Sequence, residues 1–153
     1  MTRTRPFVRR LSTAVGAVLL AACTGAAQAV PYIMFRDPGC GCCKEWAAHA
    51  REGLAHEVQV REDEPMEAVK ARLGVPDDLA SCHTAVVEGY VIEGHVPARE
   101  IERLLAERPV GVKGLAVAGM PMGSPGMEAG GRVQPYQVIA FGDAGRRVFA
   151  SYP

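Results

Sequence analysis

The sequence predicts an α/β protein in which helices flank a central mixed sheet. Between residues 32 and 107, short runs of β-branched and aromatic residues alternate with segments whose apolar residues recur at helical spacing. Two of the short runs are separated only by Glu88-Gly89, which fits an antiparallel hairpin, whereas the other runs are joined through helices. Hairpin and crossover connections together make a mixed sheet.

The first predicted elements are a strand over residues 32–35, a helix over 42–54 and a strand over 57–60. Asp37-Pro38-Gly39 interrupts the chain between the first strand and the helix. One face of the helix carries its apolar residues, which are Trp46, Ala47, Ala50 and Leu54. We expect a right-handed crossover between the two strands.

Two further helices and a hairpin complete the predicted core. A helix over 65–73 begins at Pro65 and stops before Gly74. Strands over 84–87 and 90–92 form the hairpin, and a helix over 97–107 follows. The order is therefore β-α-β-α-β-β-α, which is the order of the thioredoxin-like fold.

Glycine and proline dominate residues 111–135, where we predict a long loop rich in Gly, Pro and Met. Loops of this length are usually functional or disordered. Residues 136–141 and 148–152 then read as two strands, which form a C-terminal β extension. We expect residues 30–153 to form one domain.

Residues 1–29 have the layout of a secretory signal. A basic segment precedes an apolar run, Leu11–Ala22, of about 12 residues, well short of the roughly 20 that a membrane-spanning helix needs. Ala27-Gln28-Ala29 offers a cleavage site after residue 29, whereas Leu20-Ala21-Ala22-Cys23 resembles a lipobox with cleavage before Cys23. Both alternatives predict export to the periplasm, either as a soluble protein or with a lipid anchor on Cys23.

Residues 30–153 are mildly acidic. The chain has 17 basic and 17 acidic residues, and four of the basic ones, but none of the acids, precede residue 30. The remaining 13 basic residues against 17 acidic ones give a formal charge of −4. This charge, without a basic stripe, argues against nucleic acid as a partner.

Three cysteines lie within four residues, in Cys40-Gly41-Cys42-Cys43. Cys40 and Cys43 have C-x-x-C spacing at a predicted strand-to-helix junction, where helix amides favour the thiolate. Thiolate is both the nucleophilic and the metal-ligating form. Cys42 adds a third sulfur, and a soft cation would relieve the repulsion between such close thiolates.

Ser81-Cys82-His83-Thr84 is the second candidate segment. In a thioredoxin-like fold it packs beside the C-x-x-C turn, so Cys82 and His83 are candidate ligands. Ala85 occupies the place where thioredoxins have a cis-proline, which weakens an oxidoreductase interpretation. His95 reads as a residue at the start of a helix rather than as a ligand.

Methionines form the third candidate segment, within residues 119–128. Met120 and Met127 lie among glycines and prolines, in a stretch with little periodicity that could bury them in a core. Thioethers are soft ligands that suit Cu(I). Anchoring of the loop to the domain surface is the alternative role for these side chains.

Together the three segments resemble the CopG-type periplasmic copper-resistance proteins. The matching stretches are Asp37–Trp46, Ser81–Ala98 and Gly114–Glu128, and the similarity spans most of residues 31–141. The resemblance implies a thioredoxin-like fold, copper binding through the cysteines and a redox role in copper tolerance. Ala118 departs from the family, which usually has proline there.

Three functions fit these residues. The leading one is an envelope protein that sequesters or redox-cycles Cu(I)/Cu(II) through Cys40, Cys42, Cys43 and Cys82, where bridging thiolates could hold more than one copper. Other envelope copper-handling or redox proteins would be its partners. The alternatives are a thiol-disulfide oxidoreductase using Cys40 and Cys43 and a structural zinc site of four thiolates.

Overall fold

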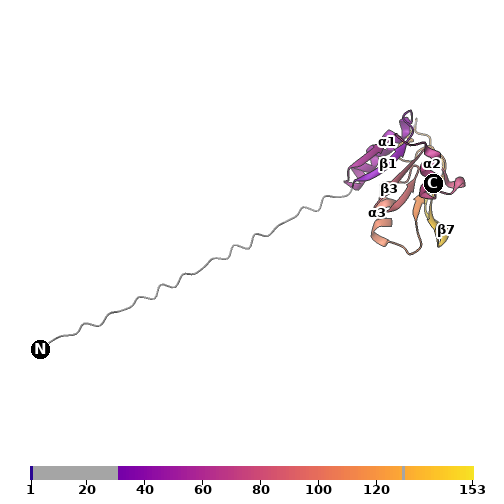
Figure 1. The fold of residues 1–153 in the computed structure, drawn as a ribbon. Helices are drawn as coiled ribbons and strands as arrows, with labels where there is room; N and C mark the ends of the chain where they lie inside the picture. Colours follow the sequence, from indigo (N-terminus) through magenta and orange to yellow (C-terminus); the bar gives the residue numbers. More distant parts are fainter. Residues whose placement is uncertain (2–30, 129) are drawn as a thin grey trace.

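A computed structural model describes residue 1, residues 31–128 and residues 130–153 (Figure 1). The predicted secretory signal and the candidate lipidation site Cys23 lie outside the described residues, so both stay predictions. Within the described part, no helix is long and apolar enough to cross a membrane.

The predicted order of elements is confirmed through residue 107, and three strands follow it. The elements are β1 (Tyr32–Arg36), α1 (Gly41–Leu54), β2 (Val58–Arg61), α2 (Met66–Leu73), a short 3-10 turn (Asp77–Leu79), β3 (His83–Val87), β4 (Tyr90–Glu93), α3 (Ala98–Glu107), β5 (Gly114–Ala116), β6 (Tyr136–Gly142) and β7 (Gly145–Tyr152).

One mixed sheet of seven strands organises the domain, in the order β2-β1-β3-β4-β5-β6-β7. The β1–β2 and β4–β5 pairs are parallel, and the other four pairs are antiparallel. The prediction of a mixed sheet with flanking helices is therefore confirmed. In Figure 1, α1 and β7 lie at opposite sides of the domain.

Alternating side chains of β1 show how the helices cover the two faces. Met34 packs with residues of α1 and α3 in the largest core cluster. Phe35, which points the other way, packs with Met66 and Val69 of α2. The sheet is thus covered by α1 and α3 on one face and by α2 on the other.

The predicted loop over 111–135 is wrong in one part, because residues 114–116 form β5. Leu115 and Ala116 are fully buried between β4 and β6. A Cβ at Gly114 would collide with the backbone carbonyl of Val91, so glycine permits this close approach. The strand is only three residues long and begins with glycine, so the sequence pattern does not indicate it.

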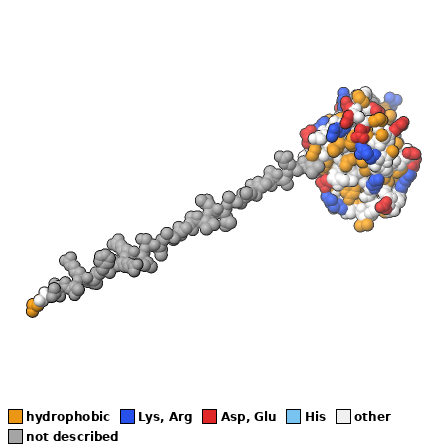
Figure 2. Space-filling view, in the orientation of Figure 1, with side chains coloured by type: hydrophobic (Ala, Val, Ile, Leu, Met, Phe, Trp, Pro, Cys, Tyr) orange, Lys and Arg blue, Asp and Glu red, His pale blue; other side chains and the backbone are white. Residues whose placement is uncertain are grey.

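The surface of the domain mixes charged and apolar side chains. On the face drawn in Figure 2, basic and acidic groups are interspersed with apolar ones. The interspersion agrees with the small net charge of residues 30–153.

Candidate metal centre

The sheet register brings two distant cysteine segments together. Cys40 lies at the N-terminal end of α1 with extended backbone angles, and it follows the turn that leaves β1. In the β1–β3 pair, Arg36 lies opposite His83. Cys82 therefore lies beside Cys40 and the first turn of α1, which carries Cys42 and Cys43, as expected from the sequence.

The four sulfurs form a compact group, which we call the cysteine cluster (Cys40, Cys42, Cys43 and Cys82). All four sulfurs lie within 4.8 Å of one another. The Cys82 sulfur is 3.4 Å from that of Cys43 and 3.9 Å from that of Cys42, and the sulfurs of Cys40 and Cys42 are 3.5 Å apart. Such spacing allows several sulfurs to share one metal ion or to bridge two.

A disulfide joins Cys40 to Cys43, whereas Cys42 and Cys82 are free. The Cα atoms of the disulfide pair are 5.4 Å apart, in the range that C-x-x-C pairs require. Disulfide sulfurs do not offer thiolate charge, so a four-thiolate site requires reduction of this pair by two electrons.

Two histidines lie next to Cys82. Its sulfur is 3.4 Å from Nδ1 of His83 and 3.1 Å from Nε2 of His95. The ligand atoms of these three residues also lie within 4.8 Å of one another. Cys82 is therefore common to a group of four sulfurs and to a group of one sulfur and two imidazoles.

His95, which the sequence pattern favours as a helix-entry residue over a ligand, lies beside Cys82. Its signal lies in the hairpin register, because Thr84 pairs with Glu93 across the Glu88-Gly89 turn. Extending that register by two residues places Cys82 opposite His95. The hairpin register thus places His95 beside Cys82 as well as shortly before α3.

Burial controls the protonation of both histidines. Burial lowers the pKa of His83 well below its usual range, and the neighbouring His95 and Lys70 act in the same direction. Burial also lowers the pKa of His95. Both rings are therefore neutral at pH 7, which is the form that binds metal.

Hydrogen bonding fixes the tautomer of His95, whereas one ring nitrogen of His83 is unpaired among the described residues. Nδ1 of His95 lies 2.8 Å from the carbonyl oxygen of Pro125 and donates to it, so the lone pair of Nε2 faces Cys82. In the described part of the chain, the buried Nε2 of His83 has no hydrogen-bond partner. The nitrogen of His83 that faces Cys82 is Nδ1, at 3.4 Å from its sulfur.

The free thiol of Cys82 resists ionisation. Burial, followed by the effect of neighbouring Cys42, raises the pKa of Cys82 to about 12. A nearby metal cation would reverse this preference, because it stabilises the thiolate directly. Proton release from Cys82 would therefore accompany metal binding if this sulfur is a ligand.

The methionine loop, residues 119–128, lies against the cluster. The backbone N–H of Gly119 donates a hydrogen bond to the carbonyl oxygen of Ala80 at 3.2 Å, two residues before Cys82. At the other end, a Cβ on Gly126 would lie 2.7 Å from both the carbonyl oxygen of Cys42 and the backbone nitrogen of Trp46. The loop thus closes on the start of α1.

The two candidate methionines differ in exposure. Met120 is 52% exposed, whereas Met127 is partly buried and follows Gly126 directly. A ligand role for either thioether stays a prediction.

A buried carboxylate, that of Glu93, holds the segment around Cys82 through hydrogen bonds. Glu93 is fully buried, and its Oε1 accepts hydrogen bonds from the Ser81 backbone N–H at 2.6 Å and from Lys70 Nζ at 2.5 Å. Its Oε2 accepts from the Thr84 hydroxyl at 2.6 Å. This network, which the sequence did not indicate, holds the backbone that presents Cys82 and His83.

The donor set fits a soft metal ion. Thiolate and neutral imidazole are preferred ligands of Cu(I) and Zn(II), whereas magnesium and calcium prefer oxygen. In its reduced form the site would present four sulfurs and two imidazole nitrogens, more than a single tetrahedral ion uses.

Comparison with known proteins adds a family context. A family model described as "Protein of unknown function, DUF411" matches residues 79–127. Two solved structures titled "Copper resistance protein copG", Form 2 and Form 1, are each 45% identical to this chain, with TM-scores of 0.74. The matches cover 80% and 81% of this chain and 98% of each solved chain. No curated protein sequence matches significantly.

Proposed function

Since this chain belongs to the CopG-type copper-resistance family, we propose that it binds copper in the bacterial envelope and contributes to copper resistance by sequestering or redox-cycling Cu(I)/Cu(II). A copper-related role follows from the family and from the group of cysteines able to hold a metal. Periplasmic location and the choice between a soluble and a lipid-anchored form rest on residues 1–29 and belong to the proposal.

The observation that carries the proposal is the position of Cys82. Its sulfur lies within 4 Å of two cysteine sulfurs and of two imidazole nitrogens. A thiolate in this position can bridge two copper ions, one held mainly by cysteines and the other with help from histidines. We therefore propose Cys40, Cys42, Cys43, Cys82 and His83 as ligands, with His95 added and Met120 and Met127 as auxiliary ligands.

The same cysteines can supply electrons. Oxidation of the thiols of Cys40 and Cys43 to a disulfide releases two electrons and two protons, which would reduce two Cu(II) ions to Cu(I). The disulfide in the structure corresponds to the oxidised end of this step. Another envelope thiol protein or reductant would have to return two electrons before a second cycle.

Thiol-disulfide exchange is the second candidate function, and the same disulfide favours it. Cys40 is partly exposed whereas Cys43 is fully buried, as expected for an attacking and a resolving thiol. This function leaves the proximity of Cys82, His83 and His95 unexplained.

Metal competition in the reduced protein tests the proposal. Because soft thiolates favour Cu(I), we expect Cu(I) to displace Zn(II) in anaerobic titrations against a Cu(I) chelator. A variant with all four cysteines replaced by serine should lose this affinity. A zinc site that resists Cu(I), or equal copper affinity in the four-serine variant, would contradict the proposal.

Four single variants separate the two candidate functions. Cys82→Ser should weaken Cu(I) binding by at least about tenfold because a shared thiolate is lost, whereas Met120→Leu and Met127→Leu should have smaller effects. Cys40→Ser is the control, because disulfide exchange requires the thiol of Cys40. If Cys82→Ser leaves copper affinity unchanged while Cys40→Ser abolishes a strong insulin-disulfide reductase activity, the second function replaces the first.

A further inference from the structure

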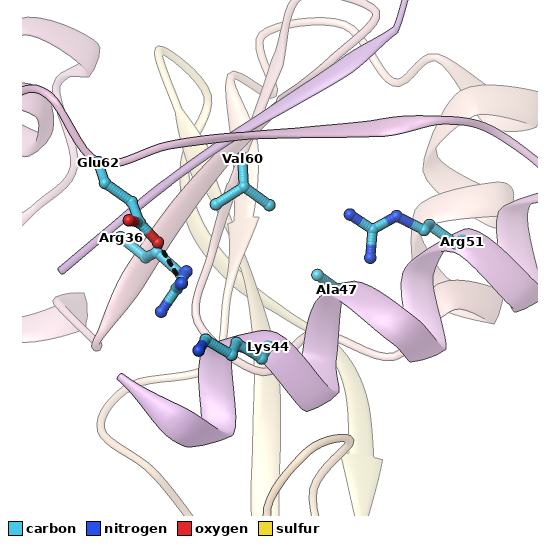
Figure 3. A pocket seen from close by; sticks show the side chains of 6 residues that line it. All are labelled: Arg36, Lys44, Ala47, Arg51, Val60 and Glu62. Atoms are coloured by element: carbon cyan, nitrogen blue, oxygen red, sulfur yellow. Dashed lines mark hydrogen bonds and ion pairs between the residues drawn. The ribbon is translucent and has the colours of Figure 1, made fainter. Parts of the chain in front are cut away.

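A cavity of about 530 Å³ lies on the side of α1 that faces β2, next to the turn that carries Cys40. The residues lining it come from the end of β1, from three positions of α1, and from β2 and the residue after it. They are Arg36, Lys44, Ala47, Arg51, Val60 and Glu62 (Figure 3).

The charge of this cavity is opposite to that of the domain. Three of its lining side chains are cationic and one is anionic, whereas residues 30–153 carry a net charge of −4. In the described part of the chain, Lys44 forms no hydrogen bond or ion pair, and Arg51 uses one amino group on the Val58 carbonyl at 2.9 Å. Both side chains have donors to spare for a ligand.

Arg36 provides the fixed cationic end of the cavity. It is 5% exposed, and its Nη1 donates to the carbonyl oxygens of Asp37, Pro38 and Cys40 at 3.0–3.2 Å. Its Nη2 pairs with Glu62, while the buried Nε has no hydrogen-bond partner among the described residues. Arg36 therefore supplies fixed positive charge at this end of the cavity, while the exposed ammonium of Lys44 supplies the free donors there.

The cations lie at two ends of the cavity with apolar side chains between them. In Figure 3, Arg36 and Lys44 are at one end, Arg51 is at the other, and Ala47 and Val60 lie between. The Lys44 ammonium at one end and the Arg51 guanidinium at the other can each bind a carboxylate, and the apolar middle suits methylene groups. A ligand that matches both ends and the middle is an organic anion with two separated carboxylates.

We propose that this cavity binds a dicarboxylate, either a free organic diacid or two acidic side chains of a partner protein. The two sources share the same chemistry, which is a pair of carboxylates joined by an apolar spacer. The site is separate from the cysteine cluster and does not depend on copper binding. It is nevertheless linked to the cysteine turn through the three carbonyl oxygens that Arg36 holds.

NMR titration of the purified protein with adipate tests the proposal. We expect saturable shifts of the backbone amides around Arg36 and Cys40, and weaker binding of the monocarboxylate butyrate. A peptide with two glutamates, compared with the same peptide carrying glutamines, tests the second source. Saturation by adipate alone identifies a free diacid, and saturation by the peptide alone identifies a partner's acidic segment. Saturation by neither overturns the proposal.

Charge-matched variants show whether binding occurs in this cavity. Lys44→Gln and Arg51→Gln should each weaken binding of the successful probe about tenfold, whereas Arg132→Gln, which removes an exposed positive charge outside the cavity, should not. Glu62→Gln should strengthen binding because the competing carboxylate is gone. Equal loss in Arg132→Gln and in both cavity variants would overturn the proposal.

Discussion

Among single residues, Cys82 is the one that belongs to both groups of candidate ligand atoms in the described part of the chain. It contacts the cysteine turn on one side and two neutral histidines on the other. Its burial keeps the thiol protonated in the absence of metal, with a pKa of about 12. Cys82 is thus a protonated thiol in the metal-free protein at neutral pH.

Alkylation of the oxidised, metal-free protein tests this state of Cys82. Because thiolate is the reactive form, the raised pKa predicts iodoacetamide labelling of Cys82 at pH 8 at least about tenfold slower than in the urea-unfolded protein with its disulfide intact. The measurement is the rate of mass increase at the Cys82 peptide.

The pH dependence of labelling separates ionisation from access. A thiol with a pKa of about 12 should react faster at every step up to pH 11, whereas an ordinary thiol levels off near pH 9 to 10. A rate that levels off below pH 10 would contradict the assignment even if labelling is slow.

At the scale of elements, the methionine loop and the start of α1 depend on each other. Gly126 has a φ of +84°, and the atoms that a Cβ would meet belong to the backbone of Cys42 and Trp46. Helix backbone cannot move aside as a flexible side chain can. The close approach therefore places the loop against the helix turn that carries the cysteines.

Gly126→Ala should disrupt this contact. It adds a clash with α1 to the cost of a positive φ, and we expect a loss of about 2 to 4 kcal/mol in the free energy of unfolding. Gly145→Ala is the matched control, because Gly145 has a φ of +83° and open space around it. It should cost only about 1 to 2 kcal/mol.

Urea unfolding of both glycine variants provides the measurement. A larger loss in Gly126→Ala, accompanied by weaker copper binding, would support the role of the loop in closing the site. Equal losses in the two variants would show that the loop does not press on α1.

At the scale of the whole molecule, buried neutral histidines link stability to pH. Burial lowers the pKa of His83 and of His95, so the folded protein keeps both rings neutral under mildly acidic conditions. In the unfolded chain the same rings have a pKa of about 6.5. The unfolded state therefore binds more protons than the folded state below that pH.

The metal-free protein should accordingly lose stability as the medium becomes acidic. The stabilisation is complete above about pH 6.5 and decreases as the pH falls from there toward the lowered pKa values of the folded state. Between pH 7.5 and 5.5 we expect the free energy of unfolding to fall by about 1 to 3 kcal/mol. Urea unfolding at three pH values provides the measurement.

A histidine variant serves as the control for this effect. His83→Gln, which removes the more deeply affected ring, should show a shallower decrease than the parent protein over the same range. A free energy of unfolding that is independent of pH in the parent would rule out neutral buried histidines.

The order of helices and strands up to residue 107 could be read from the sequence, because apolar periodicity and turn residues act locally. The same holds for the turn of Cys40, Cys42 and Cys43, whose sulfurs are neighbours along the chain. The position of Cys82 could be anticipated from the predicted topology. The roles of these residues as ligands stay predictions.

Tertiary structure alone decided the remaining features, because each depends on pairing between distant segments. Residues 114–116 become a strand only between β4 and β6, since three residues that begin with glycine have too little propensity of their own. His95 gains its contact with Cys82 through the hairpin register, and Glu93 meets Lys70 only when α2 packs on the sheet. Local sequence determines the helices and strands up to residue 107, whereas long-range packing determines the strand over 114–116 and which distant side chains meet.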